Sequence, residues 1–247
     1  MSKNHESGHT VNLASFETLI ISVKNLGSAY NPSNASITLS ALETRLKEAQ
    51  TSINHINELL PVYSNAVAAR DLLFKPFKKL STRIINAVKA SDTPQEVFEN
   101  VNTFNIKIQG KRADNLTKAE LASLTAEGKP VNQISVSQSS YDNLANTFDK
   151  LIQLLISLHN YKPNESDLQV ETLKVLESQM KLANTKVNEV SIPLQNARNA
   201  RNKIMYQANT GMIDLALTVK TYLKSVFGAG SAEYKQVATL KFTGYKP

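Results

Sequence analysis

Histidines are the residues here that could bind a metal or transfer a proton near neutral pH, and the chain has four. His5 and His9 lie close to the N-terminus, His55 falls within a helical pattern, and His159 stands beside a turn-like stretch. At a displacement of 131 residues His55 corresponds to Lys186, so the four histidines imply no symmetric metal site in the two halves of the chain. The sequence therefore predicts no metal centre.

Motifs for nucleotide binding and nucleophilic catalysis are also missing. The closest to a glycine loop, Gly228-Ala229-Gly230, lacks a preceding strand and a following Lys-Ser/Thr, which indicates a helix end. The chain has no cysteine and no Gly-x-Ser-x-Gly, which excludes thiolate nucleophiles, disulfides and the serine-hydrolase elbow. Its carboxylates are scattered along helical patterns as solvated faces. We therefore expect a non-enzymatic protein without a cofactor.

Two arginines, Arg70 and Arg201, fall on apolar heptad seams, where a guanidinium must either reach solvent or meet a carboxylate. Glu17 and Asp149 stand at corresponding places in the two halves of the chain. They are the predicted partners, Glu17 of Arg70 and Asp149 of Arg201, in pairs that would fix helix register. The alternative is that both arginines bind an anionic ligand between helices.

Basic residues gather in two stretches without acids, 72–91 and 190–213. With a net charge of +7 and a pI near 9.4, these stretches make nucleic-acid binding through basic helical faces the alternative function. No helix-turn-helix or aromatic RNA-binding motif accompanies them, and small residues in the repeated Asn-Ala-Arg of 196–201 favour close helix packing over a phosphate site. The candidate basic residues are Lys75, Lys78, Lys79, Arg83, Lys89, Arg198, Arg201 and Lys203.

The segments that must position these side chains occur twice. Displacement by 131 residues brings Tyr30-x-Pro32 onto Tyr161-x-Pro163 and Val88-Lys89 onto Val219-Lys220. We therefore expect two homologous helical repeats in tandem, at 12–112 and 140–247. A flexible N-terminal tail at 1–11 and a polar connector with one short helix at 113–139 complete the predicted organisation.

Apolar residues recur at steps of three and four through both repeats, which predicts helices. The seams run from Leu39 to Phe74 and from Leu176 to Ile204 and contain Pro61 and Pro193 without adjacent turn residues. The predicted fold class is all-α: an elongated helical bundle of two tandem halves with long, proline-kinked, coiled-coil-like helices. Segments 106–109 and 240–243 alternate apolar and polar residues and would either pair as a minor two-stranded ribbon or lie extended on the bundle.

These features favour a cytoplasmic, non-enzymatic helical scaffold or protein-interaction module. Its expected partner is another protein or a second copy of the chain. No run approaches the ~18 apolar residues needed to span a bilayer, and the first residues lack a signal-peptide core. A membrane-active helical bundle would need a long apolar hairpin that the sequence lacks, so we expect no membrane partner.

Overall fold

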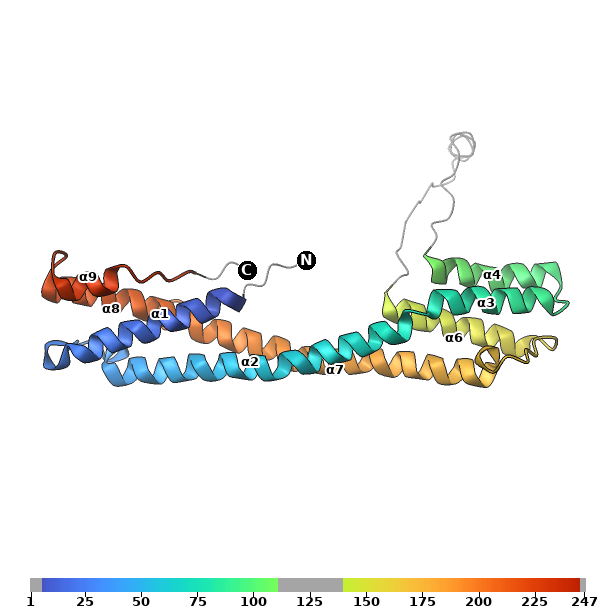
Figure 1. Ribbon diagram of the computed structural model, residues 1–247, viewed down its shortest axis with the longest axis horizontal. Helices are drawn as coiled ribbons and strands as arrows, with labels where there is room; N and C mark the ends of the chain where they lie inside the picture. Colours follow the sequence, from blue (N-terminus) through green and yellow to red (C-terminus); the bar gives the residue numbers. More distant parts are fainter. Residues whose placement is uncertain (1–5, 111–139, 245–247) are drawn as a thin grey trace, which may run out of the picture. The chain divides into compact units, whose positions relative to one another are not determined.

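The computed structural model describes residues 6–110 and 140–244, which form α-helices joined by turns and short 3-10 segments (Figure 1). No β-strand occurs within these two ranges, so the predicted all-α class is confirmed for the described part of the chain. The helices before the gap are α1 (Glu6–Asn25), α2 (Leu39–Phe74), α3 (Phe77–Ala90) and α4 (Gln95–Gln109). Those after it are α6 (Tyr141–Ser157), α7 (Val170–Tyr206), α8 (Met212–Phe227) and α9 (Ala232–Ala238).

The predicted two-stranded ribbon is wrong. Segment 106–109 is the last turn of α4, which ends at Gly110 with a left-handed φ of 69°. Segment 240–243 is extended, and its backbone pairs with a side chain rather than a strand. The Asn12 amide donates to the Thr243 carbonyl at 2.9 Å and accepts from the Thr243 N–H at 2.9 Å. The extended-tail alternative therefore applies to the C-terminal segment alone.

The predicted flexible tail is wrong from residue 6 onward, because α1 begins there. His9 within it is only 5% exposed, and its Nδ1 lies 2.5 Å from the Tyr206 hydroxyl. A buried polar contact of this kind holds the start of α1 in place. Residues 1–5 and the connector at 113–139, including its predicted short helix, lie outside the described residues.

The chain forms two compact units, and each unit takes helices from both sequence repeats. Unit one comprises Met1–Tyr63 and Val190–Pro247, and unit two comprises Ser64–Glu189. The boundaries fall inside α2 and α7, so each long helix gives one half to each unit. The compact units therefore do not coincide with the repeats at 12–112 and 140–247.

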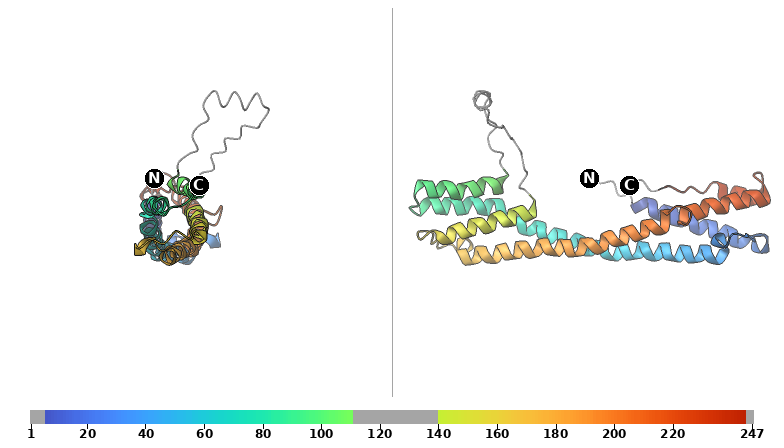
Figure 2. Two further views of the ribbon diagram at one scale, coloured as in Figure 1. Left: turned by 90° about the vertical axis from the view of Figure 1, so that its right-hand side faces the viewer. Right: turned by 180° about the vertical axis from the view of Figure 1, so that it is seen from behind.

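In unit one, α1 and the first half of α2 pack with the second half of α7, α8 and α9. α8 lies against both α1 and α9, which Figures 1 and 2 show from opposite sides. Tyr30 and Tyr222, from different repeats, stack edge to face with ring centroids 5.3 Å apart. The core is formed by Leu13, Phe16, Leu19, Ile20, Val23, Leu42, Ala49, Met205, Met212, Leu215, Ala216, Val219, Leu223 and Val237, among others.

Unit two is built from corresponding parts: the second half of α2, α3 and α4 pack with α6 and the first half of α7. α4 contacts both α3 and α6. Phe77 and Phe148, again from different repeats, are fully buried with ring centroids 4.7 Å apart. Burial of each such ring contributes about 1.5–3 kcal/mol to stability. Each core therefore depends on both repeats.

The predicted seam of α7 is buried in part. Its buried members are Met180, Val187, Leu194, Ala197 and Arg201, and its half-buried members are Leu176, Ala183, Val190 and Ile204. Both α2 and α7 continue through their prolines, so the chain does not reverse direction at either proline. The kink predicted at Pro61 and Pro193 stays a prediction.

The same turn precedes both long helices. The Tyr30 hydroxyl donates to the Ile37 carbonyl at 2.5 Å, and the Tyr161 hydroxyl donates to the Leu168 carbonyl at 2.8 Å, each across seven residues. A 3-10 segment, Ala35–Ile37 or Ser166–Leu168, completes each turn. Burial raises the pKa of the Tyr161 phenol to about 12 and raises that of Tyr30 further.

This turn predicts that part of the tyrosine population ionises only well above pH 10 when an alkaline titration is monitored by ultraviolet absorbance. We call this part the late component. Because the folded pKa of Tyr161 exceeds the ordinary 10.0, its contribution to stability is complete below pH 10 and declines as the pH rises toward about 12. Tyr161→Phe and Tyr30→Phe should each reduce the late component. A late component unchanged in both variants would contradict the buried turn.

The shared cores predict that cutting the connector does not separate the repeats. A protease site inserted between residues 113 and 139 should yield two fragments that co-elute at the mass of the intact chain and separate only in denaturant. The reason is that neither fragment contains a complete unit. Fragments that elute separately and retain helical circular dichroism would instead show that each repeat folds alone.

Candidate functional site

Two surface depressions are lined in part by charged side chains, several of which form ion pairs. In unit one, a depression of about 280 Å³ is lined by Arg45 and Glu48, which pair at 3.0 Å. In unit two, a depression of about 440 Å³ contains His159 beside Lys174, whose ammonium binds Glu171 at 2.9 Å. Among the described residues, no three histidines or carboxylates are grouped so that they could hold a metal ion.

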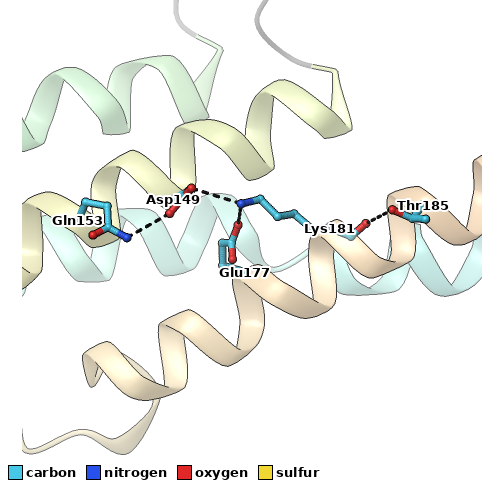
Figure 3. A network of polar contacts seen from close by, with 5 residues as sticks. All are labelled: Asp149, Gln153, Glu177, Lys181 and Thr185. Carbon is cyan, nitrogen blue, oxygen red and sulfur yellow. Dashed lines mark hydrogen bonds and ion pairs between the residues drawn. The ribbon is translucent and has the colours of Figure 1, made fainter.

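A polar network joins α6 to α7 inside unit two (Figure 3). The Lys181 ammonium lies 2.5 Å from Glu177, one turn earlier on α7, and 3.2 Å from Asp149 on α6. Glu177 is only 8% exposed, so its charge needs this partner. The Glu177 contact, supported by Asp149, raises the pKa of Lys181 against the opposing effect of desolvation. The two carboxylates share one ammonium, which leaves the network with a net charge of −1, and its contacts hold α6 against α7.

Arg70 lies at the second polar contact of unit two. Its guanidinium carbon is 4.0 Å from the ring centroid of Tyr141, a cation–π distance. The Tyr141 hydroxyl in turn donates to Asp71 at 2.6 Å, and this hydrogen bond raises the Tyr141 pKa. The contact ties the end of α2 to the start of α6.

Arg201 is 4% exposed in unit one, and its guanidinium donates to the Asn202 amide oxygen at 3.0 Å. Tyr206, one turn later on α7, accepts from the Asn12 amide at 3.4 Å and contacts His9. The C-terminal part of α7 is thereby tied to α1 and to the extended segment after α9.

The predicted pairs Arg70–Glu17 and Arg201–Asp149 require correction. Glu17 and Arg201 belong to unit one, whereas Arg70 and Asp149 belong to unit two. Glu17 is exposed, Arg70 lies over Tyr141, and Asp149 binds Lys181. The prediction assumed that each repeat folds on itself, and the division of α2 and α7 between the units invalidates that assumption.

The predicted basic patch is divided in the same way. Arg198 and Lys203 lie in unit one, and the basic residues of α3 and its preceding turn lie in unit two. Lys78 donates to the Gln109 carbonyl at 3.1 Å, and Arg83 forms a two-bond pair with Asp167. This contact raises the pKa of Arg83 and lowers that of Asp167. Lys75, Lys79 and Lys89 remain exposed, and none of the ion pairs in the described ranges includes them.

Sequence reasoning missed several residues of these networks. The spacing of four between Glu177 and Lys181 on one helix was an available signal. Tyr141 and Tyr206 gave no such signal, because their partners lie far away in sequence.

Comparison with known proteins identified no relative, since no protein-family description, curated protein or solved structure matches the chain. A search for membrane-spanning segments in the described residues found no helix with the required length and apolar character.

The Arg70 contact predicts a coupling that a double-mutant cycle can measure. Arg70→Met and Tyr141→Leu should show a coupling free energy of about 1 kcal/mol in chemical denaturation, because each change removes the same cation–π contact. The cycle of Arg70→Met with Glu17→Gln is the control and should show no coupling. Coupling to Glu17 without coupling to Tyr141 would restore the original pairing.

Proposed function

We propose that this chain is a non-enzymatic helical scaffold that binds a protein partner, or a second copy of itself, through an outward apolar row on α7. The supporting observation is the exposure of two large apolar side chains in unit two. Val175 is 57% exposed and Leu182 is 69% exposed. Their separation of seven residues places both on one helix face, where a second helix could pack.

The inner face of α7 makes this exposure informative. Leu173 and Met180 are fully buried at the same spacing, so the helix already has its core row. Val175 lies about 200° around the helix from Leu173, which places the second row on the opposite side. Apolar residues on that side add nothing to the core.

We further infer that the two repeats arose by duplication, which provides an internal comparison. Elements that match at a displacement of 131 residues include both 3-10 segments and the starts of α2 and α7. At this displacement Val175 corresponds to Thr44 and Leu182 to Thr51, and both threonines are exposed. The architecture therefore accepts threonine at these positions, so Val175 and Leu182 serve another purpose.

Nucleic-acid binding, the alternative function, has weaker support. The basic residues are divided between the units, and two of those in unit two already bind protein groups. The aromatic side chains beside the basic residues of α3, Phe74 and Phe77, are buried and so cannot stack on bases.

The proposed function is tested with Val175→Thr/Leu182→Thr, which installs the residues of the first repeat. Sedimentation over a range of concentrations, and quantitative affinity purification, should show that self-association or partner capture weakens by about tenfold or more, since each lost side chain contributes about 1 kcal/mol or more.

The matched control is Leu217→Thr/Val226→Thr, which removes two exposed apolar side chains from α8 in unit one. The control should behave like the parent protein. The role of the α7 row would be refuted if the parent protein and both variants associated equally well. It would also be refuted if both variants lost the same amount of binding.

A further inference from the structure

We propose that a second surface of unit two, formed by the last turn of α2, the turn that follows and the outer face of α3, docks an acidic helix of a partner protein. This inference rests on the proposed scaffold function and specifies the chemistry of one partner. The surface is called the basic row and consists of Leu72, Lys75, Lys79, Thr82, Asn86 and Lys89.

The basic row follows helical spacing across the two-residue turn, Lys75 and Pro76, that separates α2 from α3. Its members follow one another at alternating steps of three and four, and all six are exposed. Helical hydrogen bonding continues on both sides of Pro76: the Lys75 N–H donates to the Asp71 carbonyl at 2.9 Å, and the Leu80 N–H donates to the Pro76 carbonyl at 3.0 Å. The opposite face of α3 is the buried one and consists of Phe77, Ser81, Ile84, Ile85 and Val88.

The lysines of the row form no ion pair with an acid of the described residues. Lys75, Lys79 and Lys89 take part in no ion pair of the described residues, whereas the flanking Lys78 and Arg83 are bound to Gln109 and Asp167. The nearest acid in the chain before the row, Asp71, accepts from Tyr141. The row from Lys75 to Lys89 extends about 21 Å along the helix, the length of four turns of a partner helix.

Leu72 favours a protein partner over nucleic acid. It is 70% exposed, the highest value among the exposed large apolar side chains of the described residues. A phosphate backbone offers nothing for an isolated leucine to bury against, and the row has no aromatic ring for a base to stack on. An amphipathic helix with glutamates and one apolar residue satisfies both the lysines and Leu72.

The other repeat shows that the fold does not require this chemistry. At a displacement of 131 residues, Lys79 corresponds to Thr210 and Asn86 to Leu217. Lys89 corresponds to Lys220, whose ammonium instead donates to the carbonyls of Ala238 at 3.2 Å and Leu240 at 2.6 Å. Of these three positions in the first repeat, only Lys89 is also a lysine in the second repeat, and there the ammonium is bound to backbone carbonyls.

The test uses the full chain and a synthetic helical peptide that carries glutamates on one face and a leucine in each heptad. Binding is followed by fluorescence anisotropy at about 50 mM salt, where surface charges are weakly screened. The comparison probes are the same peptide with glutamine in place of glutamate and a duplex oligonucleotide. The acidic peptide should bind, and the glutamine peptide should bind at least about tenfold more weakly.

Variants then locate the site. Lys75→Glu/Lys79→Glu and, separately, Leu72→Ser should each weaken peptide binding by about tenfold, through lost charge attraction and lost apolar burial. Lys203→Glu/Lys224→Glu changes the net charge equally in unit one and should alter binding by less than about twofold. Unchanged circular dichroism and melting exclude misfolding as the cause.

Three results would overturn the inference. The first is the absence of peptide binding, and the second is equal weakening of peptide binding by the two charge-reversal variants. The third is that the oligonucleotide binds more tightly than the acidic peptide and that Leu72→Ser does not change its affinity. The third result would assign the row to nucleic acid. Val175→Thr/Leu182→Thr should not affect the peptide. If the peptide does not bind the basic row, the test of the α7 row is still valid. If the α7 variant behaves like the parent protein, the measurement of peptide binding is still valid.

Discussion

Burial of the inner face of α7 is the constraint on which the rest of the structure depends. Leu173 and Met180 pack into the core of unit two, whereas Leu194, Ala197 and Met205 pack within unit one. One continuous helix thus needs two sets of partners. The second half of α2, together with α3, supplies apolar partners in unit two, and the first half of α2 supplies them in unit one. Each core is complete only when both repeats contribute.

This shared construction separates what the fold requires from what differs between the repeats. The tyrosine turn occurs in both, because both long helices need a fixed start. Outside these positions the chemistry diverges: α3 displays lysines, whereas α8 displays Leu217 and Val226. Selective divergence of exposed positions is the basis for assigning binding roles to particular faces of unit two.

Local sequence patterns predicted the helices well, because a step of three or four residues reports directly on which side of a helix is buried. The burial of Met180, Val187 and Leu194 and the helical continuity through Pro193 follow from that pattern. The same pattern carries no information on which helix covers the seam. The ion pairs assigned to Arg70 and Arg201 were wrong for this reason, since their partners were chosen within one repeat.

Short segments were predicted less well, because four residues give too little pattern. Segment 106–109 alternates apolar and polar residues as a strand would. It nevertheless forms the last turn of α4, which packs against α3 and α6. Segment 240–243 has the same alternation and lies extended because Asn12 satisfies its backbone. His9 likewise could not be recognised as buried without knowledge of Tyr206. Contacts distant in sequence decided each of these outcomes.

Aromatic nuclear Overhauser contacts between the two repeats test the central claim most directly. In a sample with protonated phenylalanine and tyrosine rings in a deuterated background, the account predicts cross-peaks between Phe77 and Phe148 and between Tyr30 and Tyr222, whose ring centroids lie 4.7 and 5.3 Å apart. Dilution with unlabelled protein should not change the relative intensity of these cross-peaks, because the contacts are intramolecular. The absence of both cross-peaks in a folded, helical sample would show that the repeats do not share their cores and would contradict the account.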